Sequence, residues 1–450
     1  MTPNVVVMAA IEKLDYRVTP GDIATNAGLD VKVAERDLVD LAAETGAHLQ
    51  VSDGGDIAYQ FPQNFRTILR NKFWQLRLQQ GIQQIWRILF YLIRVSFGIV
   101  LVLSILLLAI LAVAVVIIVI KGGQKKEEGD RSESGFPSVD FDGNYPVFTS
   151  FQGWQLARLV SLSMDLFSNY SYQRPVYQQS VSQAPTSLAQ KLSPSQISEA
   201  SHHLNFLEAM FSFLFGDGNP NANLEEIRWQ TIGAVIRNHQ GAIASEQVVP
   251  YLDNIPQGIA REDEDYILPV LTRFNGRPAV SPEGQLIYYF PELQITAKES
   301  SYQSISPYLK EQRWSFSQAT GEQKIGAIAL GIVNLVLVIF VGLSAFREPF
   351  FSELQAMGLA GILEWYPILL VYGIGFLSIP VVRYCWLQWR NRKLEQRNAE
   401  RREQAQRLED VTPALQAKLD YAQKFAAQTI IDQRNLIYST ETDLLDQELS

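Results

Sequence analysis

Three long runs of apolar residues divide the chain into soluble and membrane-like parts. The longest, residues 95–120, reads VSFGIVLVLSILLLAILAVAVVIIVI and contains no charged residue. As a helix it would be about 39 Å long, whereas the hydrocarbon core of a bilayer is about 30 Å thick. Residues 325–346 and 357–382 are the other two runs, and the short loop between them predicts a helical hairpin. We therefore expect a mainly α-helical membrane protein with about three transmembrane helices.

The first 66 residues have the pattern of a winged-helix domain, in which three helices precede a two-stranded wing. Apolar residues recur at helical spacing in residues 5–14 and 31–45, and Thr19-Pro begins a short helix between them. Residues 47–61 then form two segments of β-strand composition around Asp-Gly-Gly, which predicts a β-hairpin.

The charge of this domain argues against DNA binding. Up to residue 65 it has ten acidic and four basic side chains. A recognition helix must lie among phosphates, which repel an acidic surface. We expect the third helix to dock other proteins through Glu35, Asp37 and Asp40. A membrane-tethered transcriptional regulator that binds DNA through the same domain is the alternative.

The same pattern returns in residues 223–293. Residues 51–62 (VSDGGDIAYQFP) align without a gap to residues 280–291 (VSPEGQLIYYFP), at a constant difference of 229 in residue number. An internal repeat of this kind indicates a duplicated domain. We expect a second winged helix that docks proteins through another acidic run, Glu262, Asp263, Glu264 and Asp265.

The stretches around these domains carry weaker patterns. Residues 67–94 predict a basic amphipathic helix beside the membrane, residues 121–147 a charged linker, residues 148–222 helices with irregular segments, and residues 294–324 a connector. One turn in this part has oxygen ligands of the kind that calcium prefers, but it lacks the EF-hand spacing and its terminal Glu. We predict an ordinary tight turn without an ion for Gly216, Asp217, Gly218, Asn219 and Pro220.

The sequence has no pattern typical of an enzyme. The single cysteine, Cys385, excludes an intrachain disulfide and cysteine-built zinc or iron–sulfur sites. The four histidines are not spaced as metal ligands, and we find no phosphate loop, nucleophile elbow or HExxH motif. The net charge of −9 argues against nucleic acid as the main partner. We expect no catalytic residue, no cofactor, no metal site and no DNA partner.

Polar residues in the second membrane unit indicate packing and topology rather than chemistry. Asn334 predicts a hydrogen bond between helices, and Glu364, next to Trp365 and Tyr366, predicts a position at the lipid headgroups. A small transporter that uses Asn334 and Glu364 is a further alternative.

Residues 383–450 predict a helical tail with a strongly basic beginning. By the positive-inside rule this end faces the cytoplasm or stroma and contacts anionic membrane lipid, with a ribosome or translocon contact as the alternative. The basic residues concerned are Arg383, Arg390, Arg392, Lys393, Arg397, Arg401 and Arg402.

These expectations conflict about the side of the membrane on which the first domain lies. The helical hairpin places residues 121–324 on the side of the tail. A single crossing by residues 95–120 would then place residues 1–66 on the opposite side. Yet basic residues flank the end of the first domain, and the sequence starts without a recognisable signal peptide. Charge alone leaves both topologies open.

Three features together resemble a known family. They are Phe211-Ser-Phe-Leu-Phe-Gly-Asp-Gly-Asn-Pro-Asn221, the acidic segment with Pro250-Tyr-Leu-Asp253, and the two-span unit that follows. Over residues 140–420 the chain is similar to a cyanobacterial and chloroplast thylakoid membrane family of unknown function, whose plant members are often labelled iron–sulfur cluster biosynthesis proteins. The resemblance implies a thylakoid or plasma membrane location in a phototroph. One cysteine does not support the iron–sulfur label.

We therefore expect a non-enzymatic integral membrane protein. Its duplicated winged helices would dock other membrane or membrane-associated proteins, as in an assembly or scaffolding factor of a photosynthetic membrane.

Overall fold

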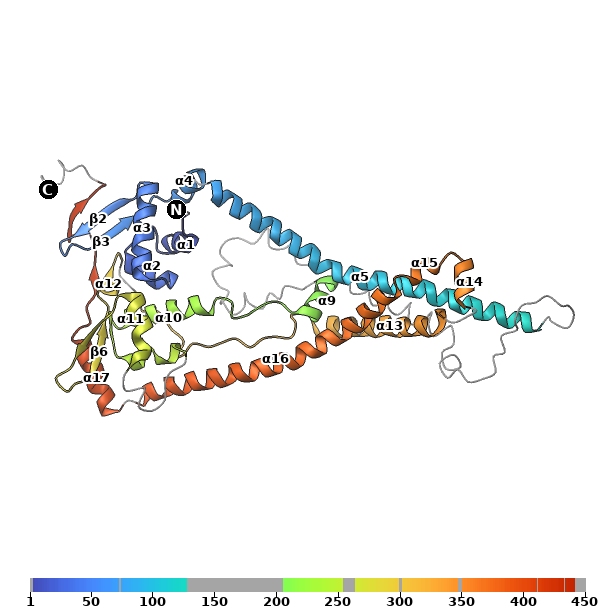
Figure 1. Cartoon of the computed structure of the whole chain (residues 1–450). Coiled ribbons are helices and arrows are strands. Elements are labelled where there is room, and N and C mark those ends of the chain that lie inside the picture. Colours follow the sequence, from blue (N-terminus) through green and yellow to red (C-terminus); the bar gives the residue numbers. More distant parts are fainter. Residues whose placement is uncertain are drawn as a thin grey trace, which may run out of the picture. The chain divides into compact units, whose positions relative to one another are not determined.

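The chain forms two compact units, each made from separate stretches of sequence. Unit 1 contains residues 1–84, 219–313 and 391–450, and unit 2 contains residues 85–218 and 314–390. The computed structural model (Figure 1) describes residues 3–72, 74–127, 205–253, 264–298, 302–346, 350–410, 412–432 and 434–441. Most of the predicted linker after residue 127, the predicted helices before residue 205, and the acids Glu262 and Asp263 lie outside these residues.

The first lobe of unit 1 comprises residues 3–61. Its second helix begins at a reciprocal cap, because the Thr19 hydroxyl accepts from the Asp22 N–H and the Asp22 carboxylate accepts from the Thr19 N–H. Gly46, in the left-handed region at φ 67°, ends the third helix. The elements in chain order are α1 (Val5–Lys13), β1 (Arg17–Val18), α2 (Pro20–Ala27), α3 (Val31–Thr45), β2 (His48–Ser52) and β3 (Ile57–Gln60).

The second lobe comprises residues 224–290. Where the sequence predicts a second helix there are two short 3₁₀ turns, because Pro250 has no N–H to continue an α-helix. The elements are α10 (Leu224–Asn238), β4 (Ala242–Ile243), η1 (Ser245–Gln247), η2 (Val249–Tyr251), η4 (Asp265–Ile267), α11 (Leu268–Phe274), β5 (Arg277–Val280) and β6 (Leu286–Tyr289).

The strands within each lobe pair with one another, and the register of this pairing is the same in both lobes. The strand orders are β1-β3-β2 and β4-β6-β5. His48 pairs with Gln60 in the first lobe, and Arg277 pairs with Tyr289 in the second; both residue numbers rise by 229 (277 − 48 and 289 − 60). The wing turns also correspond, since Gly55 and Gly284 have φ values of 82° and 83°.

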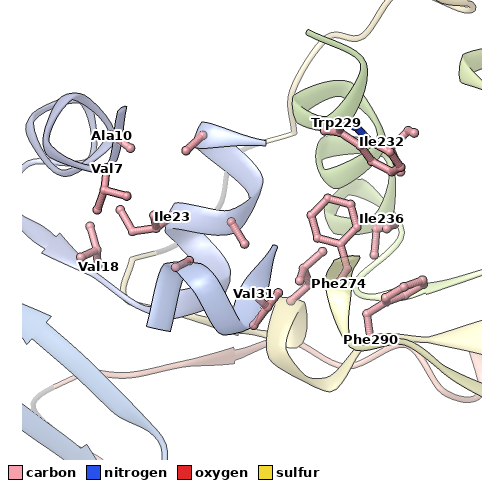
Figure 2. Packing of buried hydrophobic residues seen from close by; sticks show 14 of the residues in the cluster. Val7, Ala10, Val18, Ile23, Val31, Trp229, Ile232, Ile236, Phe274 and Phe290 are labelled. Atoms are coloured by element: carbon pink, nitrogen blue, oxygen red, sulfur yellow. The ribbon is translucent and has the colours of Figure 1, made fainter. Parts of the chain in front are cut away.

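The two lobes share one hydrophobic core. Figure 2 shows Ile23 and Val31 of the first lobe on one side of this core and Ile236 and Phe274 of the second on the other. Helices α2 and α10 approach closely at Gly233, where a Cβ would lie 3.0 Å from Thr25 Cγ2. The core is therefore complete only when both lobes are present.

A buried ion pair also joins the lobes. Arg237 Nη1 on α10 lies 2.7 Å from Asp22 Oδ1 on α2, and the side chains are 8% and 6% exposed. The other Asp22 oxygen accepts from the backbone N–H groups of Thr19 and Ala297. A buried carboxylate with these partners fixes the position of α2 against α10.

The C-terminal segment passes over both lobes. The sequence predicts one helix to about residue 433, but α17 (Pro413–Gln423) is shorter and two strands follow, β8 (Thr429–Ile430) and β9 (Leu436–Ser439). Strand β8 pairs with β7 (Ile295–Thr296), which follows the short helix α12 (Pro291–Gln294), and β9 pairs with β2. The acidic end after residue 441 lies outside the described residues.

Unit 2 is a bundle of apolar helices (Figure 1). In the part of the chain that the structure describes, three helices are long and apolar enough to cross a membrane. The helix predicted beside the membrane and the predicted transmembrane helix of residues 95–120 are parts of one helix, since α5 runs from Trp74 to Glu127, after α4 (Phe65–Lys72). The remaining elements are α9 (Phe206–Phe215), α13 (Gly321–Ala345), α14 (Phe350–Ala356), α15 (Ala360–Leu363) and α16 (Tyr366–Glu409).

The last long helix starts later than the sequence predicts. The sequence predicts a span over residues 357–382, but the long helix α16 begins only at Tyr366. Gly358 before it is in the left-handed region at φ 72°, and Pro367 lies in the first turn of the helix. The helix then continues through Pro380 into the basic tail, without a break at residue 383.

We expect removal of Arg237 to destabilise unit 1 strongly. Arg237→Ala leaves the Asp22 carboxylate buried without its cation, which should cost about 3–5 kcal/mol in the free energy of unfolding. Urea unfolding of the purified protein measures this. Arg407→Ala, which removes the exposed pair with Glu403, is the control and should cost less than about 1 kcal/mol. Equal effects of the two variants would contradict the importance of the buried pair.

Candidate interaction surfaces

The third helix of the first lobe has four acidic and two basic side chains, and the bases Lys32 and Arg36 are exposed beside the acids. Glu35 and Asp40 are exposed, and Val39 between them is 49% exposed. Asp37 is less exposed, because Asn4 Nδ2 donates to its carboxylate at 2.9 Å. Burial, and then the negative charge of Glu35, raise the pKa of the Tyr59 phenol behind this surface. Two of the three predicted docking carboxylates thus face solvent.

In the second lobe, Glu264 is already bound to another part of the same chain. Lys418 Nζ on α17 donates to the carboxylates of Glu264 and Glu246, at 2.6 and 3.0 Å. The Tyr288 hydroxyl donates to the other Glu264 oxygen at 2.9 Å. Burial, and then the charge of Glu264, raise the pKa of Tyr288. Of the predicted docking acids in this lobe that the structure describes, only Asp265 is exposed.

The predicted tight turn after α9 is a polar junction of unit 2. Asp217 Oδ1 lies 2.9 Å from Arg94 Nη2 on α5, and Asp217 Oδ2 accepts from Ser212 Oγ and from the Gln318 N–H, each at 2.8 Å. The Asp217 side chain is only 8% exposed. These bonds use both carboxylate oxygens within the protein, so the junction is structural. Gly216 and Gly218 have positive φ, and Asn219 and Pro220 continue the loop.

Arg383 completes the same junction from α16. Its guanidinium donates to the backbone carbonyls of Phe213 and Phe316 and lies over the Phe316 ring. It therefore satisfies carbonyls at the C-terminus of α9, where a cation is favourable. Sequence reasoning assigned Arg383 to the membrane surface and missed this contact.

Further along α16, two more predicted surface arginines form ion pairs inside unit 1. Arg397 Nε and Nη2 donate to Glu311 at 2.8 and 2.5 Å, and Arg401 Nη1 lies 3.0 Å from the same carboxylate. Arg401 also pairs with Asp253, which Arg228 binds from α10. The prediction of membrane contact is therefore corrected for Arg397 and Arg401, since acids far away in the sequence hold them.

These arginines shift the titration of the acids that they bind. The hydrogen bond from Arg397 has the largest influence on the Glu311 carboxyl and lowers its pKa, assisted by the charge of Arg401 and opposed by burial. For Asp253, burial has the largest single influence and raises the pKa. The bonds and charges of Arg401 and Arg228 outweigh it, so the pKa of Asp253 lies below its ordinary value.

The remaining predicted tail residues stay on the surface. Arg390 lies over the rings of Trp314 and Trp386, at 4.2 and 5.0 Å from their centroids. Three further basic side chains are exposed, those of Arg392, Lys393 and Arg402.

The two polar residues of the apolar helices lie in different environments. Asn334 on α13 is fully buried, and its Nδ2 donates to Ser104 Oγ on α5. Glu364 is the exposed residue that ends α15. Among the described residues there is no group of His, Cys, Asp and Glu that could hold a metal ion.

The chain was compared with known proteins at three levels. No protein-family model matches it, and no solved structure matches it. A chloroplastic protein of Arabidopsis thaliana, described as uncharacterized, is 32% identical over 454 residues. The match covers 98% of this chain and 79% of the relative.

We expect the arginine-bound carboxylates of unit 1, Glu311 and Asp253, to make the protein sensitive to acid. A carboxylate whose pKa is lowered by folding contributes stability above its ordinary pKa and loses that contribution as the pH falls through the lowered value. The ordinary values are 4.5 for Glu311 and 3.8 for Asp253. The unfolding midpoint should therefore fall as the pH decreases below this range.

The Glu311→Gln variant tests this assignment. It should be less stable than wild type at neutral pH, and its midpoint should fall less steeply on acidification, as measured by thermal unfolding across pH. Glu403→Gln, at an exposed pair, is the control and should follow wild type. An acid profile of Glu311→Gln parallel to that of wild type would show that Glu311 does not contribute.

Proposed function

Because the chain belongs to the family of this chloroplastic protein, we propose that it is a non-enzymatic integral protein of a photosynthetic membrane, either the thylakoid or the plasma membrane of a phototroph. Its two lobes are, in this proposal, duplicated winged-helix domains that dock other proteins during assembly of membrane complexes. The observation that carries the proposal is the exposed acidic surface of α3, on a lobe anchored to a set of long apolar helices.

The surface of α16 supports insertion into a bilayer. Its apolar window is only 22% buried within the protein, against 56% for the windows of α5 and α13. Tyr366 and Trp386, near the two ends of this surface, are separated by 20 residues, or about 30 Å along the helix. Trp365 and Trp386 are 60% and 45% exposed. Aromatic residues at this spacing match the two interfaces of a bilayer.

The lobes support docking by their form and charge. The strand order β1-β3-β2 of the first lobe matches the order β4-β6-β5 of the second, and the register is the same in both, which supports two copies of a winged helix. An acidic third helix suits a basic protein surface better than a nucleic acid. DNA binding and transport remain alternatives for which we find no supporting geometry among the described residues.

Unit 1 also indicates how the chain would cross the membrane. Its three segments form one compact body, so residues up to 84, residues 219–313 and residues 391 onward lie on one side of the bilayer in this proposal. The number of crossings between residues 84 and 219 is then even. Helix α5 supplies one of these crossings. The buried apolar helix α9 lies in this interval and in the core of unit 2.

This topology removes the conflict that the sequence left open. The first lobe lies with the basic tail on the cytoplasmic or stromal side, as the positive-inside rule requires. In this proposal the end of α5 near residue 127 lies on the opposite side, whereas the sequence alone predicts residues 121–127 on the side of the tail.

Charge reversal on α3 tests the docking function. We expect wild-type protein, purified by affinity from detergent-solubilised membranes, to recover a specific protein partner. The double variant Glu35→Lys/Asp40→Lys should recover at least about tenfold less of it, because its surface charge now repels a basic partner.

The control is Glu400→Lys/Glu409→Lys, which changes the net charge equally at exposed positions of α16. It should recover the partner as wild type does. Absence of any specific partner, or equal recovery by both double variants, would contradict docking through α3.

A further inference from the structure

The wing of the first lobe carries a fourth strand that the second lobe lacks. Strand β9 pairs antiparallel with the outer edge of β2, extending the sheet to the order β1-β3-β2-β9. The Leu49 N–H donates to the Thr440 hydroxyl at 2.8 Å, and the Thr440 N–H donates to the Leu49 carbonyl at 3.0 Å. At the other end the Asp53 N–H donates to the Asn435 carbonyl at 2.9 Å. The edge of β2 therefore has outward-facing backbone donors, and β9 uses them.

The corresponding edge of the second lobe is closed to such pairing. The constant difference of 229 places Pro278 at the position of Leu49 and Pro282 at the position of Asp53. A proline has no N–H, so it cannot donate to an added strand. Between them, the Val280 carbonyl accepts from the Tyr421 hydroxyl at 3.0 Å. Both prolines thus replace residues whose N–H groups bind the C-terminal segment in the first lobe.

Strand β9 is held by its backbone and by Leu436, which packs against the small cluster of Ala58, Ala297 and Ile431. Ile437 is 68% exposed and Tyr438 37% exposed, and the register shifts between Val51 and Ser52, as at a β-bulge. The preceding helix α17 is held differently, because Lys418 is buried in its carboxylate pair. Because no side chain of β9 is fully buried, the end of the segment can leave the sheet while α17 stays in place.

We propose that the outer edge of β2 is a strand-addition site, which an extended segment of a partner protein occupies by displacing β9. Backbone hydrogen bonds supply most of the affinity at such sites. An unprotected strand edge is also a hazard in the free protein, and β9 covers this one. The partner segment needs free backbone N–H groups at alternate positions. The site otherwise accepts different side chains. This inference rests on the proposed docking function and names a second contact of the same lobe.

The test uses full-length protein and a labelled peptide with the sequence of residues 432–441, DQRNLIYSTE. Tyr438→Pro/Thr440→Pro removes donors of β9 that face β2 and should release the strand. We expect this released variant to bind the peptide at least about tenfold more tightly than wild type, because no internal strand competes. A blocked variant, which adds Leu49→Pro and Asp53→Pro, copies the second lobe and should not bind.

Two controls keep the result interpretable. A peptide with proline at the positions of Tyr438 and Thr440 should fail to bind the released variant. Equal thermal midpoints of the released and blocked variants would show that the added prolines leave the first lobe folded. If the midpoint of the blocked variant is lower, Asp53→Pro alone is added to the released variant instead. This single addition should weaken binding of the peptide severalfold.

The proposal is overturned if the released variant binds the peptide no more tightly than wild type. It is also overturned if the blocked variant binds the peptide as tightly as the released variant. Either result leaves docking through α3 intact, because Glu35 and Asp40 are not on this edge. The converse result is that the Glu35→Lys/Asp40→Lys variant recovers the partner as wild type does while the released variant still binds the peptide. That result would overturn docking through α3 and leave the strand-addition site intact.

Discussion

The packing of α2 against α10 is the constraint on which the rest of the structure depends. Neither lobe has a complete core of its own, since Ile23 and Val31 of the first lobe belong to the same cluster as Ile236 and Phe274 of the second. The Asp22–Arg237 pair at this contact is buried and directional, so it fixes orientation as well as proximity. Two stretches separated by a long apolar helix must therefore lie on the same side of any membrane that the helix crosses.

The electrostatics of unit 1 follow from the same assembly. Three arginines from α10 and α16 converge on Asp253 and Glu311, and a lysine from α17 is buried between two glutamates. Charge that looks like a solvated basic tail in the sequence is partly neutralised within the fold. Helix α3 keeps a net negative charge, with four acids against Lys32 and Arg36. The edge that can accept a strand belongs to the same lobe. In the proposed account the first lobe carries both contacts with partners, whereas in the second lobe Lys418 binds Glu264 and prolines close the strand edge.

Local elements were predictable from the sequence because their signals are local. The Thr19-Pro start, the helical spacing of residues 5–14 and 31–45 and the Asp-Gly-Gly turn predicted the helices and hairpin of the first lobe within one or two residues. The three apolar helices were likewise evident from composition. The pairing partners were not. Glu311 and Arg397 are 86 residues apart, and Leu49 and Thr440 are 391 apart, and no periodicity links such positions. Strand β9 was missed because a short strand on a sheet edge has its partners elsewhere in the chain.

The most direct test of this account is the sidedness of three tags in oriented membrane vesicles: one at the N-terminus, one at the C-terminus and one inserted after residue 127. Protease accessibility reports the side of each tag. The shared core predicts that the two terminal tags are cleaved from the same side, and that the tag after residue 127 is cleaved from the other. Terminal tags on opposite sides would contradict the account, because the two lobes could not then form one core.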